Sequence, residues 1–120
     1  MDMRLELVPL PTTDVERSKE FYVERMGFNL DHDVQPGNGM RIVQLTPPGS
    51  ACSIVVGEGI GDPGAARVQG LHLVVDDVEE ARALLLGKDV EVSGVNDMGG
   101  VKYAYLSDPD GNSWALQQLR

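Results

Sequence analysis

Apolar residues recur along the chain in short runs, and the pattern of the first half returns in the second half. Apolar runs of about 4–8 residues are typical of β-strands, whereas apolar residues three and four apart are typical of a helix. The first half is therefore predicted to hold strands at residues 5–10, 28–34, 40–45 and 51–56, with a helix between the first two. Gly- and Pro-rich turns separate the later strands. The predicted order is βαβββ.

The helix of the first half has recognisable ends. Thr13 and Glu16 have the spacing of a capping box at a helix start. Gly27 is the residue type that commonly follows the last helical turn. The sequence therefore predicts Thr13 as the capping residue and a helix that ends before Gly27.

The second half repeats this order. Its predicted elements are a strand at residues 70–75, a helix at 76–84, and strands at 90–92, 100–106 and 112–118. The two helix starts correspond, because Asp14-Val15-Glu16 in the first half matches Asp77-Val78-Glu79 in the second. One helix cannot cover four strands alone, so neither half is expected to bury its sheet by itself.

The whole chain has 120 residues, which is the size of one domain. We therefore predict a single domain, with module one at residues 1–57, a linker at 58–68 and module two at 69–120. The linker is rich in Gly and carries no strand or helix pattern.

Charge and cysteine content narrow the range of partners and compartments. Ten basic against nineteen acidic residues give a net charge of −9, which disfavours nucleic acid and anionic membranes as partners. Cys52 is the single cysteine, so no disulfide or cysteine-cluster zinc site can form within the chain. No apolar run approaches the ~20 residues of a membrane span, and the first residues lack the apolar stretch of a signal peptide. These features predict a cytoplasmic protein.

Two motifs and the duplication together resemble a known family. The motifs are DVERS at residues 14–18, followed by Phe21-Tyr22, and SDPDGN at 107–112 before the last strand. They resemble the vicinal oxygen chelate superfamily, which includes glyoxalase I, bleomycin-resistance proteins and extradiol dioxygenases. The resemblance implies an α+β fold in which two tandem βαβββ modules form one curved mixed sheet around a concave cavity. It also implies helices on the convex side and a homodimer.

The metalloenzymes of this family hold a divalent ion with four side chains from the first, fourth, fifth and eighth strands. Carried over by position, these are Leu7, Ser53, Gly70 and Ala115. Divalent ions need oxygen, nitrogen or thiolate donors, and three of these residues have no side-chain donor. A lone serine hydroxyl is a poor ligand. No metal and no cofactor are therefore expected at these positions, and no catalytic residue is assigned.

A displaced metal site is the alternative. His72 and Gln117 each lie two residues beyond a family ligand position and stay on the cavity face of their strands. Gln44 is a candidate third donor, although the pattern leaves its face open. Such a set has no carboxylate and would bind a divalent ion weakly.

Strand alternation also predicts which side chains would contact a ligand in the cavity. The predicted ligand-binding residues are His72, Gln117, Ser53, Leu7, Gln44 and Tyr105. Simpler interpretations stand beside these, since His72 could be a core histidine and Tyr105 could pack only against its neighbours.

These observations favour a metal-free small-molecule-binding protein of the glyoxalase/bleomycin-resistance type, which holds an apolar or aromatic ligand in the concave cup. The alternative is a metal-dependent glyoxalase- or dioxygenase-like enzyme with a displaced site around His72 and Gln117. A third interpretation is a purely structural dimer whose concavity is filled by side chains.

Overall fold

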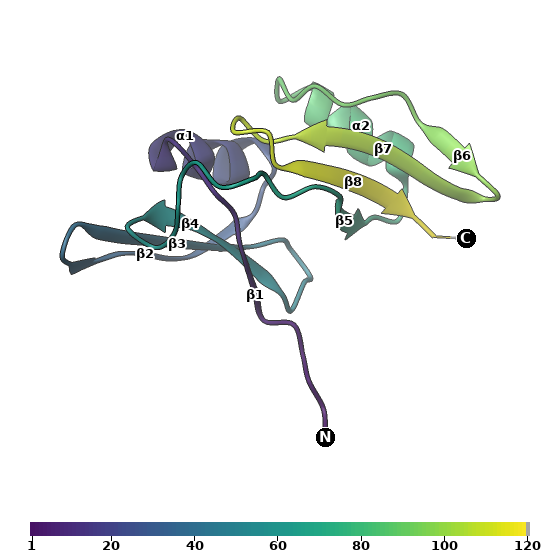
Figure 1. Ribbon diagram of the computed structural model, residues 1–120. Coiled ribbons are helices and arrows are strands. Elements are labelled where there is room, and N and C mark those ends of the chain that lie inside the picture. Colours follow the sequence, from purple (N-terminus) through teal and green to yellow (C-terminus); the bar gives the residue numbers. More distant parts are fainter. Residues whose placement is uncertain (120) are drawn as a thin grey trace. The chain divides into compact units, whose positions relative to one another are not determined.

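Two βαβββ modules follow each other along the chain in the computed structural model, which describes residues 1–119 (Figure 1). The first belongs to a compact unit at Met1–Ala66, and the second to a unit that begins at Arg67. The elements of the first module are β1 (Leu7–Pro9), α1 (Val15–Glu20), the π-helical turn η1 (Phe21–Arg25), β2 (Asn29–Gly37), β3 (Met40–Thr46) and β4 (Ser53–Glu58). Those of the second are β5 (Leu71–Val74), α2 (Val78–Leu86), β6 (Asn96–Met98), β7 (Val101–Ser107) and β8 (Ser113–Gln118).

The two modules have the same sheet topology. The strand order is β1-β4-β3-β2 in the first sheet and β5-β8-β7-β6 in the second. In each, the first strand pairs parallel with the fourth, and the other neighbours are antiparallel. The α+β fold and its duplication are thus confirmed. One shared sheet was predicted, whereas pairing among the described strands stays within each module and makes two mixed sheets.

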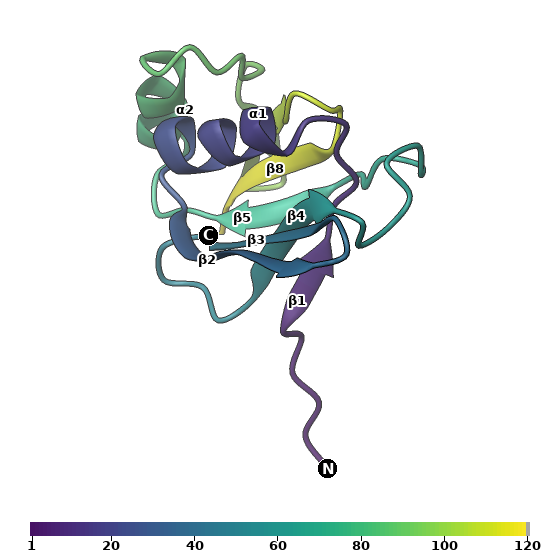
Figure 2. The same ribbon diagram turned by 90° about the vertical axis from the view of Figure 1, so that its left-hand side faces the viewer.

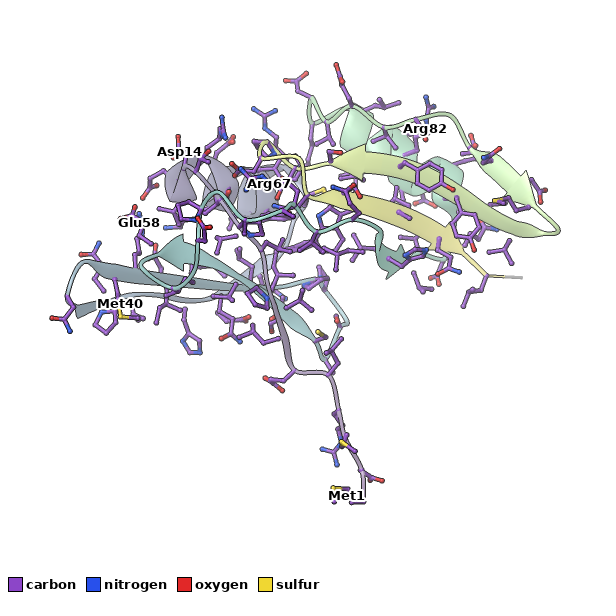
Figure 3. All side chains as sticks on the ribbon, in the orientation of Figure 1. Met1, Asp14, Met40, Glu58, Arg67 and Arg82 are labelled. Carbon is purple, nitrogen blue, oxygen red and sulfur yellow. The ribbon has the colours of Figure 1, made fainter. Side chains whose placement is uncertain are left out.

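Both α-helices begin with the same aspartate cap. The Asp14 side chain accepts a hydrogen bond from the Arg17 N–H, and the Asp77 side chain accepts one from the Glu80 N–H, each at 3.1 Å. Figure 3 shows Asp14 at the start of α1. The prediction of Thr13 as the capping residue is wrong, because Asp14 still has an extended backbone and α1 begins at Val15.

Each helix lies on one face of its own sheet. In the first module, α1 packs against β4 (Figure 2), and Tyr22, Val43, Leu45 and Val56 are fully buried. In the second, α2 packs against β7 and β8 (Figure 1) over a core that includes Leu106, Trp114 and Leu116. Within residues 1–119, no helix is long and apolar enough to cross a membrane.

The sixth strand differs from its predicted place. A strand was expected at residues 90–92, but β6 is Asn96–Met98 and pairs with the start of β7. The Asp97 side chain accepts the Gly100 N–H at 2.8 Å and so fixes the turn between them. Val90 and Val92 are buried, which explains the apolar signal that predicted a strand there.

Candidate functional site

The strand register divides the side chains of the second sheet between two faces. Trp114 and Leu116 are buried on the α2 side, and the Gln118 side-chain oxygen accepts the Val78 N–H at the start of that helix. Ala115 and Gln117, which alternate with these residues along β8, point away from α2. We call this second surface the open face; its paired residues are His72, Val74, Tyr103, Tyr105, Ala115 and Gln117.

A cavity of about 910 Å³ is lined both by residues of the open face and by residues on the α2 side of the sheet. Its lining comes from β5 and the residue before it, from the end of α2, from the segment at 91–93, and from β7, Asp108 and β8. It includes Gly70, His72, Glu91, Tyr105, Ser113 and Ala115. The segment at 91–93 reaches the cavity because the Ser93 N–H donates to the Tyr105 carbonyl at 2.9 Å. The cavity therefore brings His72 and Tyr105 together, two of the residues that the sequence predicted.

His72 is oriented by a backbone carbonyl. Its Nδ1 lies 2.6 Å from the Gly70 carbonyl oxygen. Because a carbonyl oxygen only accepts, Nδ1 carries the proton and donates, and a neutral ring then has its lone pair on Nε2. Gly70 is itself held by its N–H, which donates to the Ser113 hydroxyl at 2.9 Å.

An aromatic row crosses the open face. The His72 and Tyr103 rings meet edge to face, with centroids 6.0 Å apart, and the Tyr103 and Tyr105 rings are parallel at 6.3 Å. Gln117 Nε2 donates to the Tyr103 hydroxyl at 3.3 Å. Tyr105 is 44% exposed and lines the cavity. Gln117 thus supports Tyr103, while Tyr105 offers an apolar ring to a ligand.

The SDPDGN turn holds the strand that carries His72. Asn112 is fully buried, and its side-chain oxygen accepts the Val68 N–H at 3.0 Å. Arg67, labelled in Figure 3, donates through Nε to the Asp110 carbonyl at 2.9 Å. These bonds attach residues 67–70 to the turn and so fix where β5 begins.

The two carboxylates of the cavity lining, Asp108 and Glu91, differ in the hydrogen bonds that they accept. Asp108 is buried, and its carboxylate accepts hydrogen bonds from the Asp110 and Asn112 N–H groups and from Asn112 Nδ2. Glu91 is exposed, and no group in the described part of the chain pairs with its carboxylate. Sequence reasoning missed Glu91, because the segment at 91–93 forms no strand and reaches the cavity through its pairing with Tyr105.

The remaining predicted residues belong to the first module. Leu7 pairs with Ser53, and Gln44 pairs with Val55, which lies two residues beyond Ser53 in β4. Leu7, Gln44 and Ser53 therefore share one face of the first sheet, and the open question of the Gln44 face is answered. Ser53 is buried, and its hydroxyl lies 2.6 Å from the Thr46 hydroxyl.

The residues at the family's metal positions do not fit a divalent ion. Leu7, Gly70 and Ala115 supply no side-chain donor, and the Ser53 hydroxyl is already engaged by Thr46. Gly70 also has a φ of +77°, a conformation that a side-chain ligand would rarely adopt. In residues 1–119, no group of three or more His, Cys, Asp or Glu side chains is placed to hold a metal.

Comparisons with known proteins agree with this architecture. The model of the Glyoxalase/Bleomycin resistance protein/Dioxygenase superfamily matches residues 4–116. TnmS3, an antibiotic binding protein from Streptomyces sp. CB03234, is 35% identical, with 99% of this chain and 98% of that chain covered and a TM-score of 0.87. A glyoxalase/bleomycin resistance protein from the same organism is 38% identical, with 96% and 100% covered and a TM-score of 0.79.

A third solved structure is a superfamily member from Sphaerobacter thermophilus DSM 20745. It is 27% identical, with 99% of each chain covered and a TM-score of 0.85. No curated protein matches the chain.

Proposed function

Because the chain belongs to the Glyoxalase/Bleomycin resistance protein/Dioxygenase superfamily, we propose that it binds an apolar or aromatic small molecule in the cavity without a metal ion. The observation that carries the proposal is the cavity beside the open face, where Tyr105 exposes its ring and His72 is held by Gly70. The likeness to an antibiotic binding protein supports binding as the activity.

The energetics favour a ligand that is both aromatic and polar. A ligand of two or three rings buries about 200 Å² of apolar surface, which contributes roughly 5 kcal/mol at about 25 cal/mol per Å². The cost of association takes up much of this gain, so apolar contact alone gives weak binding. Hydrogen bonds to His72 and its neighbours are then needed for affinity and orientation.

One observation favours the alternative of an enzyme with a displaced metal. The Nε2 of His72 has no partner among the described residues and could ligate an ion. Against it, no group of three or more His, Cys, Asp or Glu side chains within residues 1–119 is placed to hold an ion, so His72 lacks a carboxylate partner for a metal. A binding site without metal therefore remains the better supported function.

We further propose a homodimer that works in the cytoplasm. The open face leaves large apolar side chains in water, among them Val74 and Tyr105, and such patches commonly mark association surfaces. A lone cysteine suits a reducing compartment.

The test uses protein purified without a histidine tag and measures binding and metal content together. Calorimetry in the presence of EDTA should detect saturable binding of at least one member of a panel of two- and three-ring aromatic compounds. Tyr105→Ala and His72→Ala should each weaken that binding about tenfold, while His32→Ala, which removes an exposed histidine of the first module, should not.

Two results would contradict the proposal. The first is the absence of binding by every compound in the panel. The second is a stoichiometric metal ion that is lost in His72→Ala, together with binding that EDTA abolishes; that result would support the enzyme alternative.

A further inference from the structure

We infer that the cavity selects aromatic ligands that carry a hydrogen-bond donor, a phenol or an amine, over aromatic ligands that carry a carboxylate or phosphate. The inference rests on the proposed function and adds the chemical class of the ligand. Two acceptors in the cavity lining, His72 and Glu91, are its basis.

The first acceptor is fixed by backbone geometry. The Gly70 carbonyl engages Nδ1 of His72 at 2.6 Å, so the neutral ring keeps its lone pair on Nε2. The Ser113 hydroxyl accepts the Gly70 N–H at 2.9 Å and holds this carbonyl in place. His72 therefore meets a ligand as an acceptor.

The second acceptor is the Glu91 carboxylate. It lines the cavity and has no partner in the part of the chain that the structure describes. An ionised carboxylate only accepts, and hydrogen bonds to a charged group are about twice as strong as neutral ones. Asp108 does not compete with it, because its oxygens are occupied by groups of Asp110 and Asn112.

The other polar groups do not reverse this preference. The hydroxyls of Tyr105, Ser107 and Ser113 can donate as well as accept, so they do not discriminate between ligand types. Among the described lining residues there is no lysine or arginine that could pair with an anionic ligand. Arg82 lies beside the lining, where its Nε donates to the Ser93 carbonyl at 2.7 Å, but it is not a lining residue. A ligand carboxylate would thus face Glu91 without a cation in the lining.

The size of the preference follows from the cost of unpaired groups. A ligand with a donor satisfies an acceptor that would otherwise lose its water, whereas a ligand without one leaves that acceptor desolvated and unpaired. Such a mismatch weakens binding, and like-charge repulsion adds to the loss for an anion. The expected discrimination is about tenfold or more.

The experiment compares three probes that share one ring system: 2-naphthol, 2-methoxynaphthalene and 2-naphthoate. Affinities are measured by fluorescence titration and calorimetry at pH 7, where the phenol is protonated and the carboxylate is ionised. We expect 2-naphthol to bind at least about tenfold more tightly than either of the others.

Variants then assign the preference to the two acceptors. His72→Phe keeps a ring without an acceptor, and Glu91→Gln replaces the charge with an amide that can donate. In the double variant, the preference for 2-naphthol over 2-methoxynaphthalene should fall to about threefold or less, and binding of 2-naphthoate should improve. His32→Phe and Glu79→Gln, which lie outside the cavity lining, are the matched controls and should leave all three affinities unchanged. Thermal unfolding shows that each variant is folded.

The outcomes separate this inference from the proposed function. If none of the three probes binds, the proposed function fails and the inference fails with it. If all three bind within about threefold of each other, or 2-naphthoate binds best, the proposed function stands and the donor preference is wrong. If the preference exists but survives in the double variant, its assignment to His72 and Glu91 is overturned.

Discussion

Asp33, on β2, is the centre of a group of ion pairs in the first module. Its carboxylate accepts hydrogen bonds from Lys19 of α1 at 2.7 Å and from two nitrogens of Arg41 on β3 at 2.9 and 3.0 Å. Arg41 also pairs with Glu16 of α1. The hydrogen bonds from Arg41 and Lys19 hold the pKa of Asp33 well below its usual range. This group of charges ties α1 to β2 and β3.

The lowered pKa of Asp33 makes a prediction about pH. A carboxyl whose pKa is lower in the folded chain adds stability above its unfolded pKa, and this is lost as pH falls toward the folded value. Because Asp33 is one-fifth exposed, we expect Asp33→Asn to lower the free energy of unfolding by about 1 kcal/mol at pH 7. Urea unfolding at several pH values should show this difference shrinking below about pH 4. Asp2→Asn is the control, and a difference that stays constant down to pH 2 would contradict the role given to Asp33.

The candidate site was partly predictable residue by residue. Alternation along β5 and β8 places His72 and Gln117 on the face away from α2. Their neighbours on the other face, half-buried in β5 and buried at Leu116 in β8, fix the phase of each strand. Glu91 was not predicted, since it reaches the cavity only through the pairing of Ser93 with Tyr105. That pairing joins residues far apart in sequence, and no local pattern specifies it.

At the scale of elements, turn chemistry predicted the order of strands and helices. The repeated aspartate before each helix, and the Gly-rich turns, are local signals that act the same way in both modules. Three details were not predicted: the cap at Asp14, the position of β6, and the π-helical turn at Phe21–Arg25. In η1, Phe21 and Tyr22 are both buried. The spacing of apolar residues predicts a helix there, but it does not distinguish a π-helical turn from an α-helical one.

The corrected cap gives a prediction for α1. Asp14→Ala removes the acceptor for the Arg17 N–H and should lower the free energy of unfolding by about 1 kcal/mol. Thr13→Ala leaves the Arg17 N–H and its acceptor Asp14 in place, so it should cost a few tenths of that amount. Chemical denaturation of both variants decides between the two caps. A larger loss for Thr13→Ala would restore the capping box that the sequence predicted.

At the scale of the whole molecule, the net charge of −9 bears on which partners are disfavoured, and the exposed apolar residues bear on which surface associates. A negative net charge disfavours nucleic acid and anionic lipid as partners. The open face of the second module, by contrast, exposes apolar side chains that a second copy or a ligand would cover.

The proposed homodimer can be tested by analytical ultracentrifugation. Val74, on the open face, and Leu84, on α2, are both 63% exposed, so they form a matched pair. We expect the wild-type protein to sediment as a dimer, Val74→Asp to weaken the dimer by about tenfold or more, and Leu84→Asp to leave it intact. A monomer at all concentrations, or a dimer that only Leu84→Asp disrupts, would contradict an interface on the open face.

The most direct test of ligand binding in the second module is an NMR titration of the ¹⁵N-labelled protein with 2-naphthol in the presence of EDTA. Binding as proposed predicts saturable shifts that are largest at the backbone amides of His72, Glu91, Tyr105 and Ala115. Shifts centred elsewhere in the chain, or shifts that require an added divalent ion, would contradict it.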